Sequence, residues 1–319
     1  MAISLSKLKR SLIGVSPKEA TSFIAQDSED LPHLEAVVLS ALEGYHATLD
    51  SSRLEKLVPQ LDKVPLAMRG YAYEGAAMGL TGLDCMMPWK NRLQEYIEGP
   101  GSPHLYMVHI GAGEALARLG RKPEPFINKM KDHSVSWLML EGYGFHEGFF
   151  RRPRYVEAQA IPSHLSAYAR CIFDQGVGRS IWFTEGARIE RVAAMIEIFP
   201  TERQANLWLG VGVGSTYVGG LERPRIEKLR QVAGSYANYM AVGAAFVAKG
   251  RQRAGNEVPH TDLSCEVLCG LSAEEAAHQT SLAFLDLPAE SPQIAFETIQ
   301  QRLLAKFTTS AYQQQGGLK

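Results

Sequence analysis

The chain has 319 residues, of which 45% are hydrophobic and 21% charged, and its formal net charge is −1. This is the composition of a globular protein, and the near-neutral charge excludes the basic field that binds nucleic acids or anionic membranes. The sequence has no apolar run of about 18 residues, no secretion signal and no disulfide framework among its four cysteines. We therefore expect a cytoplasmic protein with no membrane span and no nucleic-acid partner.

Apolar residues recur at helical spacing in several segments along the chain. The first segment, 31–49, places five apolar side chains on one face: Leu34, Val37, Val38, Ala41 and Leu42. Segments 188–199 and 291–307 have the same periodicity, and a Ser-Pro pair opens the latter. Ser272 and Glu275 have the spacing of a capping box. Alternating strand patterns bounded by hairpin turns are absent, so the sequence predicts an all-α protein.

Glycines two residues apart interrupt several of these helical segments. Gly111 and Gly113 follow an apolar run, as in a dinucleotide-binding loop, but Leu116 stands where the third glycine of that motif is required. The pair recurs at Gly212 and Gly214, an offset of 101 residues. A phosphate-binding loop would not be repeated, so we interpret the glycines as contacts between closely packed helices or as space for a ligand.

Small-residue clusters recur every 27–37 residues, which is the period of stacked helical hairpins. The prediction is an all-α helical-repeat array, a TPR-like α/α superhelix with an internal repeat of about 100 residues. We expect an N-terminal arm (1–30) followed by a single domain (31–319). The approximate repeats within that domain are 36–135, 136–231 and 232–305.

Two acidic blocks are candidates for acid–base chemistry. Glu74 stands among tyrosines and alanines, where burial would raise its pKa, and Tyr73 beside it is a candidate for substrate binding. His146 is a candidate general base, with Tyr143 and Glu147 as candidate binding residues. The alternatives are an ion pair for the glutamate and a structural hydrogen bond for the histidine.

A third block, 173–180, contains Asp174, Gln175 and Arg179. We assign Asp174 a catalytic role, and Gln175 and Arg179 substrate binding, because a guanidinium can hold a carboxylate or phosphate with two hydrogen bonds. The alternative is pairing along one helix, Arg170 with Asp174 and Gln175 with Arg179, because both pairs are four residues apart.

The fourth block, 251–261, has the pattern of a helix end. Gly255 and Asn256 favour a left-handed cap and Pro259 prevents the helix from continuing, so we expect His260 in a loop. We assign His260 a catalytic role and Asn256 a binding role. No P-loop, HExxH, DDxxD or GxSxG motif is present, and we expect neither a metal nor an organic cofactor.

Four sequence blocks carry a resemblance to a known family: RGYAYEGAAMGL, GYGFHEGFF, FDQGVGRSIWF and AGNEVPHT. In these blocks the chain resembles a bacterial family of unknown function whose members are named enediyne biosynthesis proteins. The resemblance implies a place in the biosynthesis of polyketide-derived or other specialised metabolites, and it implies no mechanism.

Two functional hypotheses follow. The first is a cofactor-independent enzyme that binds an apolar polyketide, polyene or aromatic precursor and promotes its cyclisation or isomerisation by acid–base catalysis. The second is a non-catalytic helical-repeat scaffold that binds an intermediate or another enzyme of the pathway. A homodimer is compatible with both. The first hypothesis expects Glu74, His146, Asp174 and His260 to meet in one cavity.

Overall fold

The computed structural model describes residues 14–130, 135–288 and 291–316, with side chains as far as residue 309. Residues 1–13 of the expected N-terminal arm lie outside this part. The described residues contain helices and no strand, which confirms the all-α prediction. Seven helices form the centre of the fold: α3 (Leu31–Asp50), α5 (Leu66–Met86), α7 (Leu105–Arg118), α9 (Leu138–Phe150), α10 (Ala167–Thr184), α12 (Thr201–Val218) and α14 (Ala237–Ala254).

The remaining helices surround these seven or extend from them. They are α2 (Pro17–Thr21), α4 (Leu54–Leu61), α6 (Arg92–Glu98), α8 (Glu124–Ile127), α11 (Ile189–Glu197), α13 (Arg223–Ala233), α15 (Pro259–Cys269), α16 (Ala273–Ala283) and α17 (Pro292–Gly316). Short 3₁₀ turns at Ser102–His104 and Gly234–Tyr236 and a π-helical turn at Pro153–Glu157 complete the fold.

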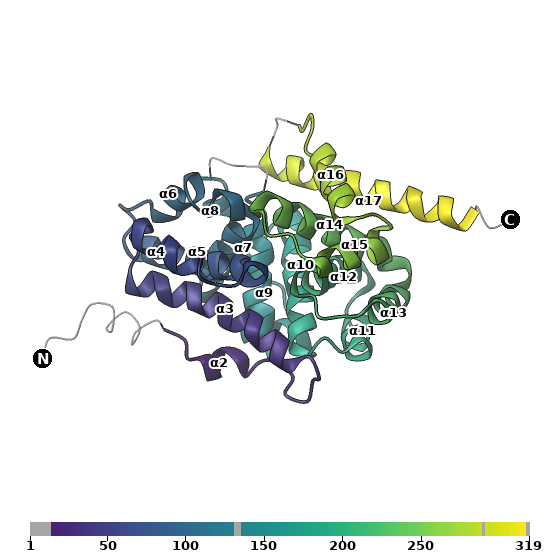
Figure 1. Cartoon of the computed structure of the whole chain (residues 1–319), viewed down its shortest axis with the longest axis horizontal. Coiled ribbons are helices and arrows are strands. Elements are labelled where there is room, and N and C mark those ends of the chain that lie inside the picture. The colour runs from purple at the N-terminus through teal and green to yellow at the C-terminus, as the bar shows by residue number, and fades with distance from the viewer. Residues whose placement is uncertain (1–13, 131–134, 289–290, 317–319) are drawn as a thin grey trace, which may run out of the picture.

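The seven central helices pack in chain order, each against the next, from α3 to α14 (Figure 1). Helices near the two ends of this series also touch, α14 with α5 and α3 with α12, so the array curves back on itself. The Arg251 guanidinium of α14 donates to the carbonyl of Ala67 in α5 at 3.3 Å, and His33 of α3 lies 2.8 Å from the Val218 carbonyl at the end of α12. One hydrophobic core runs through the described helices from α3 to α17.

Glycine pairs make the contacts between successive central helices. A Cβ atom on Gly111 would lie 2.0 Å from the Glu74 carbonyl oxygen of α5, and one on Gly113 would lie 1.8 Å from the Met139 oxygen of α9. The first glycine of the pair thus faces the preceding helix and the second faces the following one. These distances are far below any real contact, so the helices approach this closely only because the side chains are absent.

The same arrangement recurs in α9, α10 and α12 with the pairs Gly142/Gly144, Gly176/Gly178 and Gly210/Gly212. This confirms the helix-contact interpretation and corrects its register, because the partner of Gly111 and Gly113 in α12 is Gly210/Gly212. The glycines that face the preceding helix are Gly75, Gly111, Gly142, Gly176, Gly210 and Gly243, which are 31–36 residues apart.

Helix ends follow the sequence signals in most places. The predicted capping box at Ser272 and Glu275 is present, and α17 begins at Pro292. Gly255 adopts the left-handed conformation and ends α14 as predicted. However, α15 begins at Pro259, so His260 lies in the first turn of a helix and not in a loop.

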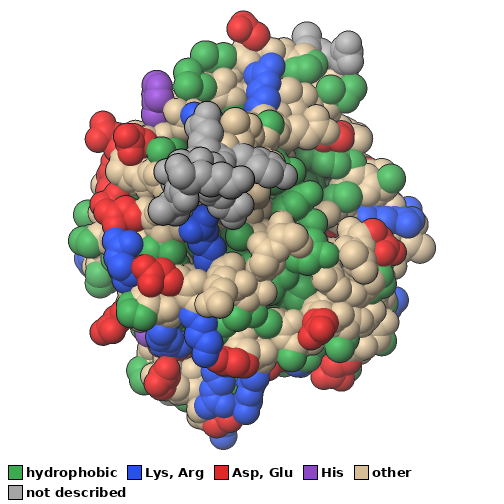
Figure 2. Space-filling model, turned by 90° about the vertical axis from the view of Figure 1, so that its right-hand side faces the viewer, with side chains coloured by type: hydrophobic (Ala, Val, Ile, Leu, Met, Phe, Trp, Pro, Cys, Tyr) green, Lys and Arg blue, Asp and Glu red, His purple; other side chains and the backbone are tan. Residues whose placement is uncertain are grey.

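The surface carries charges of both signs. Figure 2 shows basic and acidic side chains interspersed, with hydrophobic side chains between them and no large area of one sign on this face. Of the helices that the structure describes, none combines the length and the hydropathy needed to cross a bilayer.

Candidate functional site

The glycine contacts fix which side chains point to the inside of the array. In each central helix, consider the glycine that faces the preceding helix. The residue one position before this glycine and the residue three positions after it are four residues apart, so they share one helix face. In α5 these are Glu74 and Met78, in α7 Ile110 and Glu114, in α9 Glu141 and Phe145, and in α10 Gln175 and Arg179. Every one of these side chains lines one of two internal cavities.

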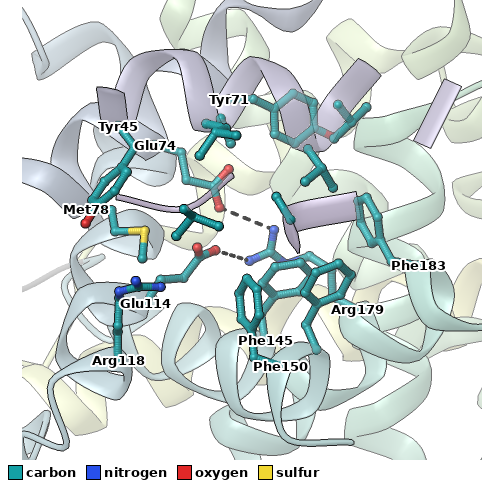
Figure 3. A pocket seen from close by; sticks show the side chains of 18 residues that line it. Tyr45, Tyr71, Glu74, Met78, Glu114, Arg118, Phe145, Phe150, Arg179 and Phe183 are labelled. Carbon is teal, nitrogen blue, oxygen red and sulfur yellow. Dashed lines mark hydrogen bonds and ion pairs between the residues drawn. The ribbon is translucent and has the colours of Figure 1, made fainter. Parts of the chain in front are cut away.

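Arg179 stands at the centre of this inner face and meets three glutamates from three helices. Figure 3 shows its contacts with two of them, Glu74 and Glu114. Its Nε lies 2.6 Å from Glu141 Oε1, and its two Nη atoms lie 3.4 Å from Glu74 Oε1 and 3.5 Å from Glu114 Oε1. The guanidinium also lies over the ring of Phe145, 3.9 Å from its centroid. The residues of the cluster Glu74/Glu114/Glu141/Arg179 are all buried.

The cluster contains three carboxyl groups and one cation, so full ionisation would leave excess negative charge in the interior. Burial, and then the charge of Glu74, raises the pKa of Glu114 well above its usual value. Burial also raises the pKa of Glu74 and Glu141, although Arg179 opposes it. Burial alone would lower the pKa of Arg179, but the three glutamates raise it.

These shifts favour a protonated Glu114, and a hydrogen bond between the two carboxyl groups raises the pKa of Glu114 and lowers that of Glu74. Glu141 is the close ionic partner of Arg179. One protonated and one ionised carboxyl group side by side can give a proton to a bound molecule and accept one from it.

An apolar cavity of about 80 Å³ adjoins this carboxyl pair. Aromatic side chains form much of its wall, including Tyr71, Phe149, Phe150 and Phe183. Figure 3 shows the carboxyl groups of Glu74 and Glu114 together with the Arg179 guanidinium between these aromatic residues. The volume of the cavity is small for the number of side chains that line it, and we refer to it as the slot. Residues of α2 and α3 contribute part of its wall.

The centre of the cluster is filled by the guanidinium, in the position that a metal ion would need among three carboxylates. Within the described ranges, no group of three or more His, Cys, Asp or Glu side chains has a metal-binding arrangement.

Of the residues predicted from the sequence, the structure brings Glu74 and Arg179 together. His146, Asp174 and His260 lie elsewhere, so the four predicted catalytic residues do not share one cavity. His146 of α9 is buried with its ring 4.8 Å from that of Phe150, and burial lowers its pKa to about 3. A histidine that remains neutral in this way has little basicity at neutral pH.

Asp174 forms a two-point ion pair with Arg203 of α12, at 2.6 and 2.9 Å. This corrects the pairing expected along one helix, because Arg170 donates instead to the Leu165 carbonyl. Gln175 hydrogen-bonds to Gln300 of α17 and not to Arg179, and it lines the second cavity.

Tyr143 and Glu147 lie in a separate cluster with Arg151, which pairs with Glu147 at 3.1 Å. Burial raises the pKa of Glu147 to about 7 and that of Tyr143 to about 12. Neither of these two residues lines the cavity beside Glu74.

His260, Asn256 and Tyr73 also have surroundings of their own. The His260 ring lies 3.3 Å from the Tyr217 carbonyl, and burial lowers its pKa to about 4. The backbone carbonyl of Asn256 accepts a hydrogen bond from Arg251 at 3.1 Å. Tyr73 donates to Asp62 at 3.0 Å, away from the cluster.

Sequence reasoning missed Glu114 and gave Glu141 no role of its own. The signal that identifies both is their position relative to the glycine contacts. Glu141 directly precedes Gly142, as Glu74 precedes Gly75, and Glu114 follows Gly111 by three residues, as Arg179 follows Gly176.

Comparison with known proteins gives one match of near full length. The model of a family described as "Protein of unknown function (DUF1702)" matches residues 4–307. No curated protein and no solved structure matches the chain.

Proposed function

We propose a function from the buried site itself, because the chain belongs to this family and the description of the family assigns no activity. The protein is a cofactor-independent enzyme that binds a slender apolar precursor in the cavity beside Glu74 and Glu114. It promotes isomerisation or cyclisation of that precursor by proton transfer. The observation that carries the proposal is a pair of buried carboxyl groups, both with raised pKa, at the wall of an apolar, aromatic slot.

The proposed reaction moves protons and needs no oxidant. Glu114 gives its proton to a carbon–carbon double bond or a carbonyl oxygen of the substrate, and Glu74 removes a proton from another carbon. A new double bond or ring bond replaces the one that was protonated, so electrons are conserved. Aromatic faces stabilise positive charge that develops in the substrate, and Arg179 keeps Glu74 available as a base.

The shape of the cavity favours a linear polyene or polyketide chain over a fused aromatic system. A volume of about 80 Å³ is well below the roughly 300 Å³ at which pockets for drug-sized ligands begin. A narrow slot accepts an extended chain or one end of it. The setting in specialised-metabolite biosynthesis belongs to the proposal and rests on the resemblance of the four sequence blocks.

The proposal also includes the repeat architecture. A contact that recurs at 31–36 residues supports a helical-repeat array of TPR-like size, with one central helix in each unit. The repeat of about 100 residues then corresponds to three such units.

The test is substitution of the carboxyl pair without a change of shape. Glu114→Gln keeps the hydrogen bond to Glu74 but has no acidic proton, and Glu74→Gln removes the base. We expect both variants to fold and to fail to complement a deletion of the gene, with accumulation of the same precursor as in the deletion. Glu202→Gln, at an exposed glutamate of α12, is the matched control and should complement fully. Full complementation by Glu114→Gln would overturn the catalytic proposal.

The alternative function is a non-catalytic binding protein for the same kind of molecule. The observation that favours it is the separation of His146, Asp174 and His260 from the cavity. The two functions are distinguished by Val38→Trp, which narrows the slot from α3, whereas the carboxyl pair belongs to α5 and α7. A binding protein would lose function with Val38→Trp and keep it with Glu114→Gln, whereas the enzyme would lose it with both.

A further inference from the structure

A second cavity, of about 40 Å³, also borders the Glu74/Glu114/Glu141/Arg179 cluster. It is bounded by α7, α9, α10, α12, α14 and α17. Its wall is largely apolar, with Ile110, Leu209 and Phe246 from the inner face and Phe296 from α17. Tyr106, Val213, Gly250 and Gln300 are partly exposed, so they mark its outer end.

Two side-chain pairs separate this cavity from the first. One is the ion pair between Arg179, which lines the first cavity, and Glu141, which lines the second. The other is the edge-to-face pair of Tyr71 and Tyr217, whose ring centroids are 4.9 Å apart. The two cavities therefore border the same cluster, the first at Glu74, Glu114 and Arg179 and the second at Glu141.

Glu141 lines the second cavity and has one carboxyl oxygen without a hydrogen-bond partner among the described residues. Its Oε1 is held by Arg179, but its Oε2 is buried and has no hydrogen-bond partner among the described residues. The whole side chain is 2% exposed. A buried carboxylate oxygen without a donor is unfavourable, and a ligand that supplies one would be bound for that reason.

We propose that the second cavity is a binding site for a slender, neutral, apolar molecule that carries a hydroxyl group. The hydroxyl donates to Glu141 Oε2 and the aliphatic part lies between the apolar side chains of the wall. A water molecule fits less well, because it needs two to four polar partners, and the two glutamines at this cavity already bond to each other at 3.1 Å. This proposal does not depend on the proposed enzymatic function.

The test compares two isomeric probes of nearly equal size, 1-butanol and methyl propyl ether. Only the alcohol has a donor, so we expect it to bind the full-length protein at least about tenfold more tightly, measured by ligand-observed NMR. Equal binding of the two probes would overturn the assignment of Glu141 Oε2 as the recognition group.

Variants locate the site. A Cβ atom on Gly250 would lie 3.6 Å from the Tyr106 side chain, which is an ordinary contact, so Gly250→Leu should fold, fill the outer end and abolish binding of 1-butanol. Val213→Phe narrows the same cavity from α12 and should do the same. Gly82→Leu, at a helical glycine with no described atom within 4 Å outside its own helix, is the matched control and should bind normally.

Val38→Trp, which fills only the first cavity, should also leave this binding unchanged. Retained binding in both Gly250→Leu and Val213→Phe, or loss of binding in Val38→Trp, would place the alcohol elsewhere and overturn the proposal. None of these readouts depends on proton transfer by Glu74 or Glu114, so failure here is distinguishable from failure of the proposed function.

Discussion

Replacement of Gly111 by alanine tests how the helices of this protein are held together. The added methyl group would lie 2.0 Å from the backbone oxygen of Glu74, whereas ordinary contacts begin near 3.4 Å. The difference of about 1.4 Å requires α7 to move away from α5, because the atom in the way belongs to the backbone and not to a flexible side chain. We therefore expect the substitution to destabilise the fold even though alanine is the better helix former.

The magnitude follows from two opposing effects. Overpacking costs up to about 3 kcal/mol, and the gain from replacing a helical glycine is about 1 kcal/mol, so the net loss is about 2 kcal/mol. In a chain of this size that lowers the thermal midpoint by roughly 4–8 °C. Gly82→Ala, where no described atom outside its own helix lies within 4 Å, should raise the midpoint by a few degrees.

The assay is thermal unfolding of both variants by circular dichroism under identical conditions. Helix propensity alone predicts that both substitutions raise the thermal midpoint. A lower midpoint for Gly111→Ala and a higher one for Gly82→Ala would therefore indicate the helix contact. If Gly111→Ala were as stable as the parent protein, the close approach of α5 and α7 would not be the contact that we describe.

Three further predictions concern buried charge. Arg179→Met leaves the three glutamates without a cation and should destabilise the protein by about 3–5 kcal/mol at pH 7.5, with a smaller loss at pH 5 as the carboxyl groups take up protons. The pKa of His146 is about 3 in the folded state against 6.5 when exposed, so the parent protein should lose stability as the pH falls below 6.5, by up to about 1.4 kcal/mol per pH unit from this group. His146→Phe should show a shallower decline in the same titration; an unchanged slope would count against a neutral buried imidazole. The pKa of Glu147 is raised to about 7, so its contribution to stability is present below pH 4.5 and lost by pH 7. Glu147→Gln should therefore raise the thermal midpoint at pH 8 and leave it unchanged at pH 4.5, and a lower midpoint at pH 8 would show that the ion pair with Arg151 dominates.

The helical class and several helix ends were predictable because they depend on local sequence. The cap at Ser272, the proline that opens α17 and the left-handed Gly255 each act within a few residues. The loop expected at His260 was wrong for a related reason. Proline is favoured in the first turn of a helix as well as after its end, and the sequence alone does not distinguish the two positions.

The site was only half predictable, because burial of a glutamate depends on which helices pack against it. Glu114 is a single acidic residue in a largely apolar helical segment. From the sequence alone, such a residue is expected on the face of the helix that is exposed to solvent. Asp174 and Arg203 are 29 residues apart, so the sequence pointed to the nearer Arg170. Only the pairing of glycines across α5, α7, α9 and α10 assigns these residues to the inside or the outside.

The glycine contacts that hold the central helices together therefore also form the site. Close approach at the glycines brings carboxyl oxygens of Glu74 and Glu114, from two helices, within 3.5 Å of the Arg179 guanidinium of a third. Longer distances between the helices would admit water and weaken the burial and the electrostatic coupling that raise the pKa of Glu114. The Gly111→Ala variant, in which α7 moves away from α5, should for this reason lower the pKa of Glu114 toward its usual value. Carboxyl-resolved NMR or infrared titration of the variant measures that change directly, and an unaltered titration of Glu114 would separate the packing of the helices from the chemistry of the cluster.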